Sequence, residues 1–267
     1  MATILDARSD TSVTATPKPG DSYVQSFARG LEVIRSFSAS APRQTLSQVA
    51  AASGLTRAGA RRILLTLQTL GYVETDGKLF ALTPRILDLG FAYLSSMPIW
   101  NRAEPLMDAL VAHVQESCSA AVLDGTDIVY VMRVATQKIM SISLGVGSRL
   151  PASCTSMGRL LLSDLGAAEA RARIEASPRE ALTRYTVTDV DALHARVMLA
   201  KTQGWCLVDQ ELEEGLVSIA APIVNRAGRM VAALNISGQA NRTSAKVMRE
   251  TMLPHLLEAA RRISALI

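Results

Sequence analysis

Three arginines at helical spacing, Arg57, Arg61 and Arg62, have the clearest chemical meaning in this sequence. They follow Thr56 and lie off the apolar stripe of their segment, so they are expected on the exposed face of a helix. Small Ala58 near its start would let this helix approach the floor of a DNA major groove, where arginine contacts guanine edges or phosphates. A small helical domain with solvated arginines is the alternative interpretation.

The pattern around these arginines predicts a winged helix-turn-helix. Ser47 and Thr56 would place helix N-termini on phosphates, Lys78 in the wing would reach another phosphate, and Arg43 completes the expected DNA contacts. The expected elements are a helix over 26–37, a short helix capped by Thr45 or Ser47, a turn at 53–55, a helix from Thr56 to Gly71, and strands over 72–75 and 79–82 joined by an Asp76-Gly77 turn.

The positive charge of the chain is concentrated in this segment. Residues 20–85 contain eight basic and four acidic side chains, which accounts for the whole net charge of +4. A local basic excess is typical of a phosphate-binding module, although solvated basic faces are also common.

The rest of the chain predicts a linker helix and a larger α+β domain. The helix over 85–96 ends at Met97-Pro98 and is either a linker, a dimer contact or ordinary core packing. We expect a mainly antiparallel sheet of about six strands, over 119–123, 128–134, 139–144, 205–209, 216–224 and 230–236. The expected helices cover 99–116, 156–162, 167–175, 190–203 and 244–266, with a kink at Pro254. The expected organisation is a disordered tail (1–20), a DNA-binding domain (21–83), a linker helix (84–98) and a ligand-binding domain (99–267).

A candidate anion site lies in residues 151–159. This segment opens a helix whose first turn has no Asp or Glu, so its free N–H groups and its dipole favour a negatively charged ligand. The alternative is that Ser153 or Thr155 simply caps the helix. Polar Ser218, Asn235 and Ser237 interrupt apolar strands and are candidates to line a pocket or, equally, to lie at the edge of the sheet. The acidic run 209–214 is interpreted as a solvated loop.

Enzyme motifs are absent from the sequence. Residues 145–150 lack the third glycine of a dinucleotide fingerprint, and no Walker loop or G-x-S-x-G elbow occurs. Cys154 and Ser156 have no nearby histidine to act as a base, and the three cysteines and three histidines show no disulfide or zinc spacing. We therefore expect no catalytic residues, no metal and no cofactor.

The sequence shows no sign of a membrane or secreted protein. No apolar run approaches the roughly 20 residues of a membrane helix, and the first 19 residues lack the apolar core of a signal peptide. A cytoplasmic location is expected, with no membrane partner.

Several motifs together resemble the IclR-type bacterial transcription regulators. The resemblance spans about residues 21–267 and rests on the segments SFARGL (26–31), SGLTR (53–57), LTPR (82–85), LPASCTSMGR (150–159), ELEEGL (211–216) and IAAP (219–222). Residues 23–26 (YVQS) and 233–237 (ALNIS) resemble the branch that controls aromatic-acid degradation through the β-ketoadipate pathway, the protocatechuate and 4-hydroxybenzoate regulators.

The resemblance implies a winged-helix domain, a linker helix and a GAF-like effector domain. It implies homodimers or homotetramers on palindromic double-stranded DNA operators, a small carboxylic-acid effector, and RNA polymerase as a further candidate partner. Its effector contacts correspond to the main chain of Ser156 and Met157 and to Asp209, Ser218, Asn235 and Ser237. Ser218 replaces a common cysteine and Asn235 a common serine, which puts the effector's identity in doubt. An acid would also favour a cation, for which Arg133 or Arg149 is our candidate.

The sequence therefore predicts a DNA-binding transcription regulator controlled by an aromatic acid or a β-ketoadipate-pathway intermediate. The alternatives are a small-molecule enzyme of α+β fold with a helical appendage, and a nucleic-acid-binding structural protein without an effector.

Overall fold

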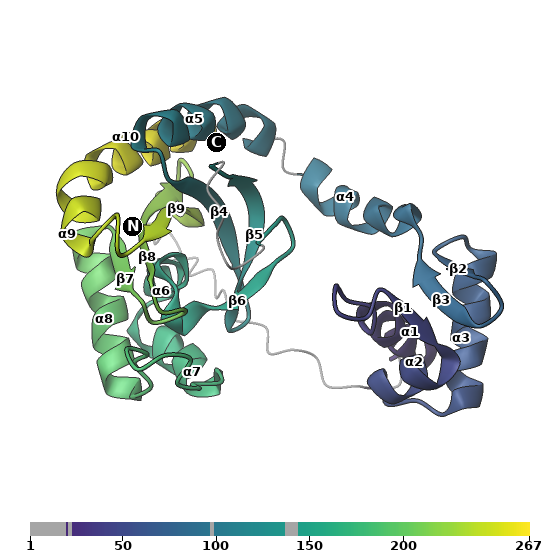
Figure 1. Cartoon of the computed structure of the whole chain (residues 1–267). Helices are drawn as coiled ribbons and strands as arrows, with labels where there is room; N and C mark the ends of the chain where they lie inside the picture. Colours follow the sequence, from purple (N-terminus) through teal and green to yellow (C-terminus); the bar gives the residue numbers. More distant parts are fainter. Residues whose placement is uncertain (1–19, 21–22, 97–98, 137–143) are drawn as a thin grey trace, which may run out of the picture. The chain divides into compact units, whose positions relative to one another are not determined.

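The computed structural model of the chain describes residues 20, 23–96, 99–136 and 144–267. The chain divides between Tyr93 and Leu94 into two compact units, here called the N-terminal unit and the C-terminal unit (Figure 1). Each unit has its own hydrophobic core, so each is described by itself. The domain boundaries expected at 20/21, 83/84 and 98/99 remain predictions.

The N-terminal unit is a winged helix-turn-helix. Its elements are α1 (Gln25–Arg35), β1 (Arg43–Thr45), α2 (Leu46–Ala52), α3 (Arg57–Thr69), β2 (Val73–Thr75) and β3 (Leu79–Leu82). The three strands form an antiparallel sheet in the order β1-β3-β2. The apolar periodicity predicted the helices and the β2–β3 hairpin, but β1 was not expected because three residues after a proline carry no readable strand pattern.

Threonines begin both helices of the helix-turn-helix. Thr45, rather than Ser47, caps α2: its hydroxyl accepts from the amide of Gln48, and the Gln48 side chain accepts from the Thr45 amide in return. Thr56 caps α3 as predicted, because its hydroxyl accepts from the Gly59 amide at 3.1 Å. Ser47 instead lies exposed within α2.

The predicted linker helix begins with a short 3₁₀ turn. Pro84–Ile86 forms this turn, and α4 (Leu87–Ser95) continues from it. Proline has no N–H to leave unsatisfied and its φ suits the first turn of a helix, so it marks the start at this position.

A six-stranded antiparallel sheet organises the C-terminal unit. Its order is β6-β5-β4-β9-β8-β7. The strands are β4 (Ser117–Asp124), β5 (Asp127–Val134), β6 (Arg149–Pro151), β7 (Cys206–Asp209), β8 (Leu216–Val224) and β9 (Met230–Gln239). Six strands were expected, but the predicted strand over 139–144 falls mainly on residues outside those described, and β6 follows it in a segment expected to be a loop.

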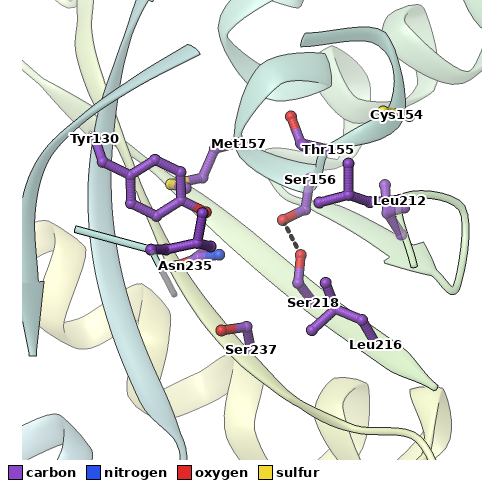
Figure 2. Close-up of a pocket in the computed structure, with 12 residues that line it drawn as sticks. Tyr130, Cys154, Thr155, Ser156, Met157, Leu212, Leu216, Ser218, Asn235 and Ser237 are labelled. Carbon is purple, nitrogen blue, oxygen red and sulfur yellow. Dashed lines mark hydrogen bonds between the residues drawn. The ribbon is translucent and has the colours of Figure 1, made fainter. Parts of the chain in front are cut away.

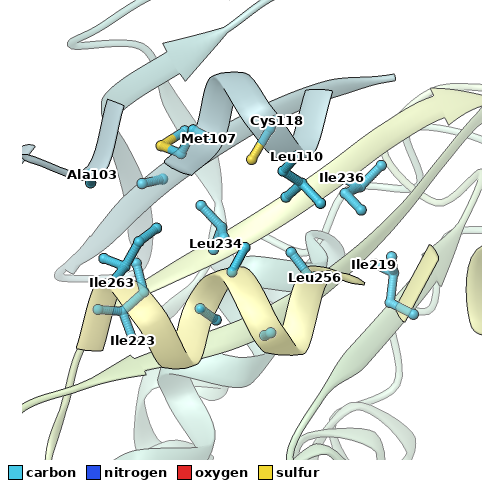
Figure 3. Packing of buried hydrophobic residues seen from close by; sticks show 14 of the residues in the cluster. Ala103, Met107, Leu110, Cys118, Ile219, Ile223, Leu234, Ile236, Leu256 and Ile263 are labelled. Atoms are coloured by element: carbon cyan, nitrogen blue, oxygen red, sulfur yellow. The ribbon is translucent and has the colours of Figure 1, made fainter. Parts of the chain in front are cut away.

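Helices cover both faces of this sheet. One face packs against α5 (Ile99–Val114) and α10 (Leu253–Ser264) through Met107, Leu234 and Leu256 (Figure 3). On the other face α6 (Ser156–Asp164) packs directly against the sheet, and α7 (Ala167–Ala176) and α8 (Val190–Gln203) pack against α6 and each other. Burial on both faces makes the central strands nearly continuous apolar runs, and the few polar residues among them are therefore informative.

The C-terminal helical segment is interrupted before Pro254, as predicted. The short α9 (Ala245–Val247) passes into a π-helical turn, Met248–Met252, and Pro254 then lies in the first turn of α10. Among the described helices, none combines the length and the hydropathy needed to cross a bilayer.

Gly158 supports a close contact inside the C-terminal unit. A Cβ at this position would overlap the backbone of Ala152, in the turn that precedes α6. We expect Gly158→Ala to lower the free energy of unfolding by about 1–3 kcal/mol, because backbone must move to relieve the overlap. Gly145→Ala is the control, since no described atom lies within 4 Å of its added Cβ. Equal midpoints for both variants in chemical denaturation would contradict the packing described.

Candidate functional site

All eight side chains predicted to contact DNA are exposed. The set comprises Arg43, Ser47, Thr56, Arg57, Ala58, Arg61, Arg62 and Lys78. On α3, Ala60, Leu64 and Leu67 are buried against the rest of the N-terminal unit. Arg57 and Arg61 flank this buried stripe and are exposed to solvent, so both guanidinium groups are accessible, as a recognition helix requires. Neither α2 nor α3 has an acidic residue in its first turn, so both N-termini remain favourable for phosphate.

Two of these basic residues, Arg62 and Arg43, have neighbours that make them less available for contact with DNA. Arg62 lines a groove between α1 and α3, so it lies to the side of the face formed by Arg57 and Arg61. Arg43 forms an ion pair of 2.9 Å with Asp76 in the wing turn. The Asp76 carboxylate also accepts from the amides of Leu79 and Lys78, and these hydrogen bonds, with Arg43 nearby, hold its pKa below the ordinary value. Lys78 is thus carried on a well-ordered wing turn.

A pocket in the C-terminal unit lies between the start of α6 and the sheet (Figure 2). Its cavity volume is about 30 Å³, which is room for about two water molecules, so the lining side chains must move apart before a ligand of the size of an aromatic acid can enter. The lining residues come from strands β5, β7, β8 and β9, from two loops, from the turn before α6 and from α6 itself: Tyr130, Leu144, Cys154, Thr155, Ser156, Met157, Val208, Leu212, Leu216, Ser218, Asn235 and Ser237. Five of the eight predicted effector residues, Ser156, Met157, Ser218, Asn235 and Ser237, therefore meet in one place.

The N-terminus of α6 forms one wall of this pocket. Thr155 caps the helix by accepting from the Gly158 amide at 3.2 Å, so the capping alternative is correct for that amide. The amides of Ser156 and Met157 occupy the first two helical positions and have no intrahelical carbonyl to donate to. The hydroxyls of Ser156 and Ser218 hydrogen-bond to each other across the pocket (Figure 2).

A β-bulge brings Arg133 to the pocket side of the sheet. The register shifts between Ala120 and Ala121, which pair with Met132 and Tyr130, so β5 has one additional residue at this point. Tyr130 and Arg133 consequently face the same side. Arg133 donates to the Ser119 hydroxyl at 3.2 Å, and Ser119 pairs with Asn235. Arg133 thus lies next to the pocket without lining it.

The structure places two other predicted effector residues away from the pocket. Arg149 is exposed on β6, where its guanidinium pairs with Asp124 at 2.7 Å and Asp127 at 3.2 Å. Asp209 is exposed and pairs with Val217, so alternation along β7 directs it away from the face that carries Ser218. The pocket roles expected for Arg149 and Asp209 have no support in this geometry.

The buried acidic residue beside the pocket is Glu211, which sequence reasoning missed. The run 209–214 was interpreted as a solvated loop, yet Glu211 is 3% exposed and forms an ion pair with Arg159, which is 1% exposed. A glutamate in an acidic run gives no sign of burial, and the partner lies 52 residues away.

Burial keeps the titratable lining groups neutral. Loss of hydration raises the pKa of Tyr130 to about 12, although Arg133 opposes this shift, so its phenol is a hydrogen-bond donor at physiological pH. Burial also raises the pKa of the Cys154 thiol to about 11, which leaves a poor nucleophile.

Two histidines lie closer together than their sequence positions indicated. His113 on α5 and His255 on α10 have their Nε2 atoms 3.0 Å apart. The described residues contain no group of three or more potential metal ligands. This pair lies on the face of the sheet opposite the pocket and does not contribute to it.

Comparison with known proteins identifies both units. The model of the IclR helix-turn-helix domain matches residues 26–77, and the model of the bacterial transcriptional regulator IclR C-terminal domain matches residues 91–265. The chain is 41% identical to the Pca regulon regulatory protein of Pseudomonas putida, over 90% of this chain and 82% of that protein. A solved transcriptional regulator from Rhodococcus sp. RHA1 is 48% identical with a TM-score of 0.81, over 91% of this chain and 98% of that one.

A second solved structure resembles the C-terminal unit. It is the inducer-binding domain of the PobR transcription factor from Acinetobacter, a double mutant in complex with 3-hydroxybenzoic acid. It is 31% identical with a TM-score of 0.59, and the alignment covers 63% of this chain and 98% of that domain.

Proposed function

Because the chain belongs to the IclR family of bacterial transcription regulators, we propose that it is a regulator whose operator binding responds to an aromatic carboxylic acid. It is a DNA-binding regulator and not an enzyme. The observation that carries the proposed effector is the convergence of the α6 N-terminus with three polar strand residues, Ser218, Asn235 and Ser237, in one largely apolar pocket.

The N-terminal unit is proposed to read its operator with α3. Arg57 and Arg61 reach base edges or phosphates in the major groove, while the capped N-termini of α2 and α3 approach the backbone. Lys78 contacts a phosphate from the wing. Arg62 and Arg43 lie at the margin of this surface, because one borders α1 and the other is already paired with Asp76.

The C-terminal unit is proposed to hold the acid with its carboxylate at the start of α6. The amides of Ser156 and Met157 donate to the carboxylate, and the Ser156–Ser218 pair opens so that a hydroxyl can donate as well. The ring packs among Met157, Leu212 and Leu216, and a ring hydroxyl reaches Asn235 or Ser237. The aromatic acid bound by the related PobR domain and the named Pca regulon relative support this class of effector.

The regulator is proposed to act as a homodimer through an apolar surface of the N-terminal unit. A groove between α1, α3 and α4 is lined by Phe27, Leu31, Leu70 and Leu89, and Phe91 on α4 is 68% exposed. Contiguous exposed apolar residues of this size are typical of an interface. A two-fold dimer would present two α3 helices to half-sites about one DNA turn apart. Pairing of dimers into tetramers and contact with RNA polymerase are further proposals that follow from the family alone.

Loss of the Arg61 guanidinium should weaken operator binding. Arg61→Ala should cost about 1–3 kcal/mol if the residue reads a base, measured by gel shift or fluorescence anisotropy on operator DNA at fixed salt. Arg226→Ala removes the same charge from an exposed turn of the C-terminal unit and should leave binding within about twofold, because it lies outside the proposed interface. Unchanged affinity of the Arg61 variant would exclude Arg61 from the interface.

The pocket should bind an aromatic acid more tightly than a dicarboxylate. In calorimetric titration, 4-hydroxybenzoate and protocatechuate should bind with a lower Kd than β-ketoadipate and muconate. Ser218→Ala should weaken binding of the preferred acid about tenfold to a hundredfold, because a hydrogen bond to a charged group contributes about 1.5–3 kcal/mol. Ser163→Ala is the control: this α6 hydroxyl bonds to the Leu160 carbonyl outside the pocket. Equal affinities for all three proteins would place the acid elsewhere.

Charge introduced on the apolar face should dissociate the dimer. Phe91→Glu should shift the full-length chain from dimer to monomer in sedimentation equilibrium, because a carboxylate is costly to desolvate at an interface. Leu199→Glu alters a similarly exposed apolar residue of α8 in the C-terminal unit and should not change the mass. A dimer that persists in Phe91→Glu would move the interface away from α4.

A further inference from the structure

The proposed effector is an anion, yet the described wall of the pocket contains no charged side chain. Anions in apolar surroundings are strongly destabilised unless positive charge or hydrogen-bond donors compensate for the lost hydration. The N-terminus of α6 provides donors and a partial charge of about half a unit. Positive charge can therefore come only from residues beside or behind this wall: Arg133 lies next to the β5 side, and a second source lies behind α6.

A buried ion pair lies directly behind the α6 wall. Arg159 donates to both carboxylate oxygens of Glu211, at 2.8 and 2.6 Å, and both side chains are almost completely buried. The Nε–H of Arg159 donates to the Ser153 carbonyl at 2.7 Å. Cys154 and Leu212 line the pocket. Each directly follows a residue of this network, because Cys154 follows Ser153 and Leu212 follows Glu211, so the ion pair lies immediately behind two walls of the pocket.

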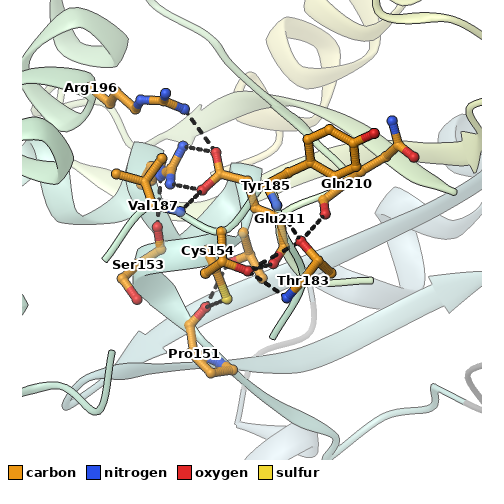
Figure 4. Close-up of polar contacts among 12 residues, drawn as sticks. Pro151, Ser153, Cys154, Thr183, Tyr185, Val187, Arg196, Gln210 and Glu211 are labelled. Atoms are coloured by element: carbon orange, nitrogen blue, oxygen red, sulfur yellow. Dashed lines mark hydrogen bonds and ion pairs between the residues drawn. The ribbon is translucent and has the colours of Figure 1, made fainter. Parts of the chain in front are cut away.

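A second arginine binds the same carboxylate. Arg196 on α8 donates to Glu211 Oε1 at 2.9 Å, and the Val187 amide donates to the other oxygen at 3.1 Å (Figure 4). The side chain of Arg196 is 51% exposed, in contrast to Arg159. Two guanidinium groups thus share one carboxylate, and the cluster Arg159–Glu211–Arg196 has one positive charge in excess.

Arg159 and Glu211 act electrostatically on the pocket wall itself, and Arg196 acts on a residue close behind it. Although burial dominates the raised pKa of the Cys154 thiol, Arg159 lowers that pKa and Glu211 raises it. Cys206, which pairs with Ala220 on the pocket side of the sheet, is influenced by all three members of the cluster. Charges act over such distances inside a protein because screening by water is weak there.

We propose that the Arg159–Glu211–Arg196 cluster supplies long-range positive charge from behind α6, in addition to that of Arg133, and that this charge helps the pocket to select an anionic ligand over a neutral molecule of the same shape. Arg196 is the residue that provides the excess charge, since Arg159 and Glu211 neutralise each other. This inference rests on the proposed function, because it assumes an acid in the α6 pocket.

Arg196→Met tests the inference because it removes the charge and keeps a long apolar side chain. Glu211 retains both bonds from Arg159, so no buried charge is left unpaired. The full-length chain is titrated calorimetrically with 4-hydroxybenzoate and with its neutral analogue 4-hydroxybenzamide. We expect the affinity for the acid to fall about three- to tenfold, the effect of one partly screened charge, while the affinity for the amide changes less than twofold.

Two control variants separate charge from structure. Arg196→Lys keeps the charge and should retain most of the preference for the acid. Arg171→Met removes another half-exposed arginine, which joins α7 to Asp191 on α8 outside the pocket, and should change neither affinity. An acid-to-amide ratio in Arg196→Met equal to that of the parent chain would overturn the inference, as would equal weakening of both ligands. Failure of the parent chain to bind either probe would overturn the proposed effector, and the inference with it.

Discussion

The salt bridge between Arg159 and Glu211 is the interaction on which the C-terminal unit depends most. Removing two charges from water is costly, and the cost is recovered only when geometry is good and the remaining hydrogen-bonding groups are satisfied. Here the Arg159 guanidinium donates to both carboxylate oxygens of Glu211 and to the Ser153 carbonyl. Arg196 and the Val187 amide donate to the same carboxylate and satisfy its remaining acceptor sites. These contacts join α6, α8, the segment before α8 and the β7–β8 loop. The pocket lies between two of the elements so joined, and its shape follows from this bond.

Each unit contains a helix that begins with a threonine cap and whose N-terminus we propose as an anion-binding site. Thr56 begins α3 and Thr155 begins α6, and each hydroxyl accepts the amide three residues on. Neither helix has an acidic residue in its first turn, so each N-terminus remains favourable for an external anion. In α3 we propose a DNA phosphate as the anion, in solvent surroundings. In α6 we propose a carboxylate in apolar surroundings, where each donor and each distant charge has a larger effect.

Local patterns predicted most of the fold and the exposure of the side chains that we expect to contact DNA. The apolar stripe of α3, the Thr56 cap and the Asp76-Gly77 turn each depend on neighbouring residues, so a sequence shows them directly. Contacts between residues that are far apart in the sequence are harder to predict from it. The bulge opposite Ala120 and Ala121 decides which side of the sheet Arg133 faces, and no residue of β5 indicates it. Alternation along β7 excludes Asp209 from the pocket, and recognising this required the register with β8. Glu211 belongs to an acidic run that resembles a loop, and only its contacts with Arg159 and Arg196 show why it is buried.

The central claim is that the start of α6 receives the carboxylate of an aromatic acid. A crystal structure of the chain with 4-hydroxybenzoate tests this claim most directly, because it gives the orientation of the ligand as well as its position. The account predicts the carboxylate within hydrogen-bond distance of the Ser156 and Met157 amides, with the ring among Met157, Leu212 and Leu216. A ligand bound in the opposite orientation, with its carboxylate directed away from α6, or one bound beside Arg149 or outside the pocket, would contradict it.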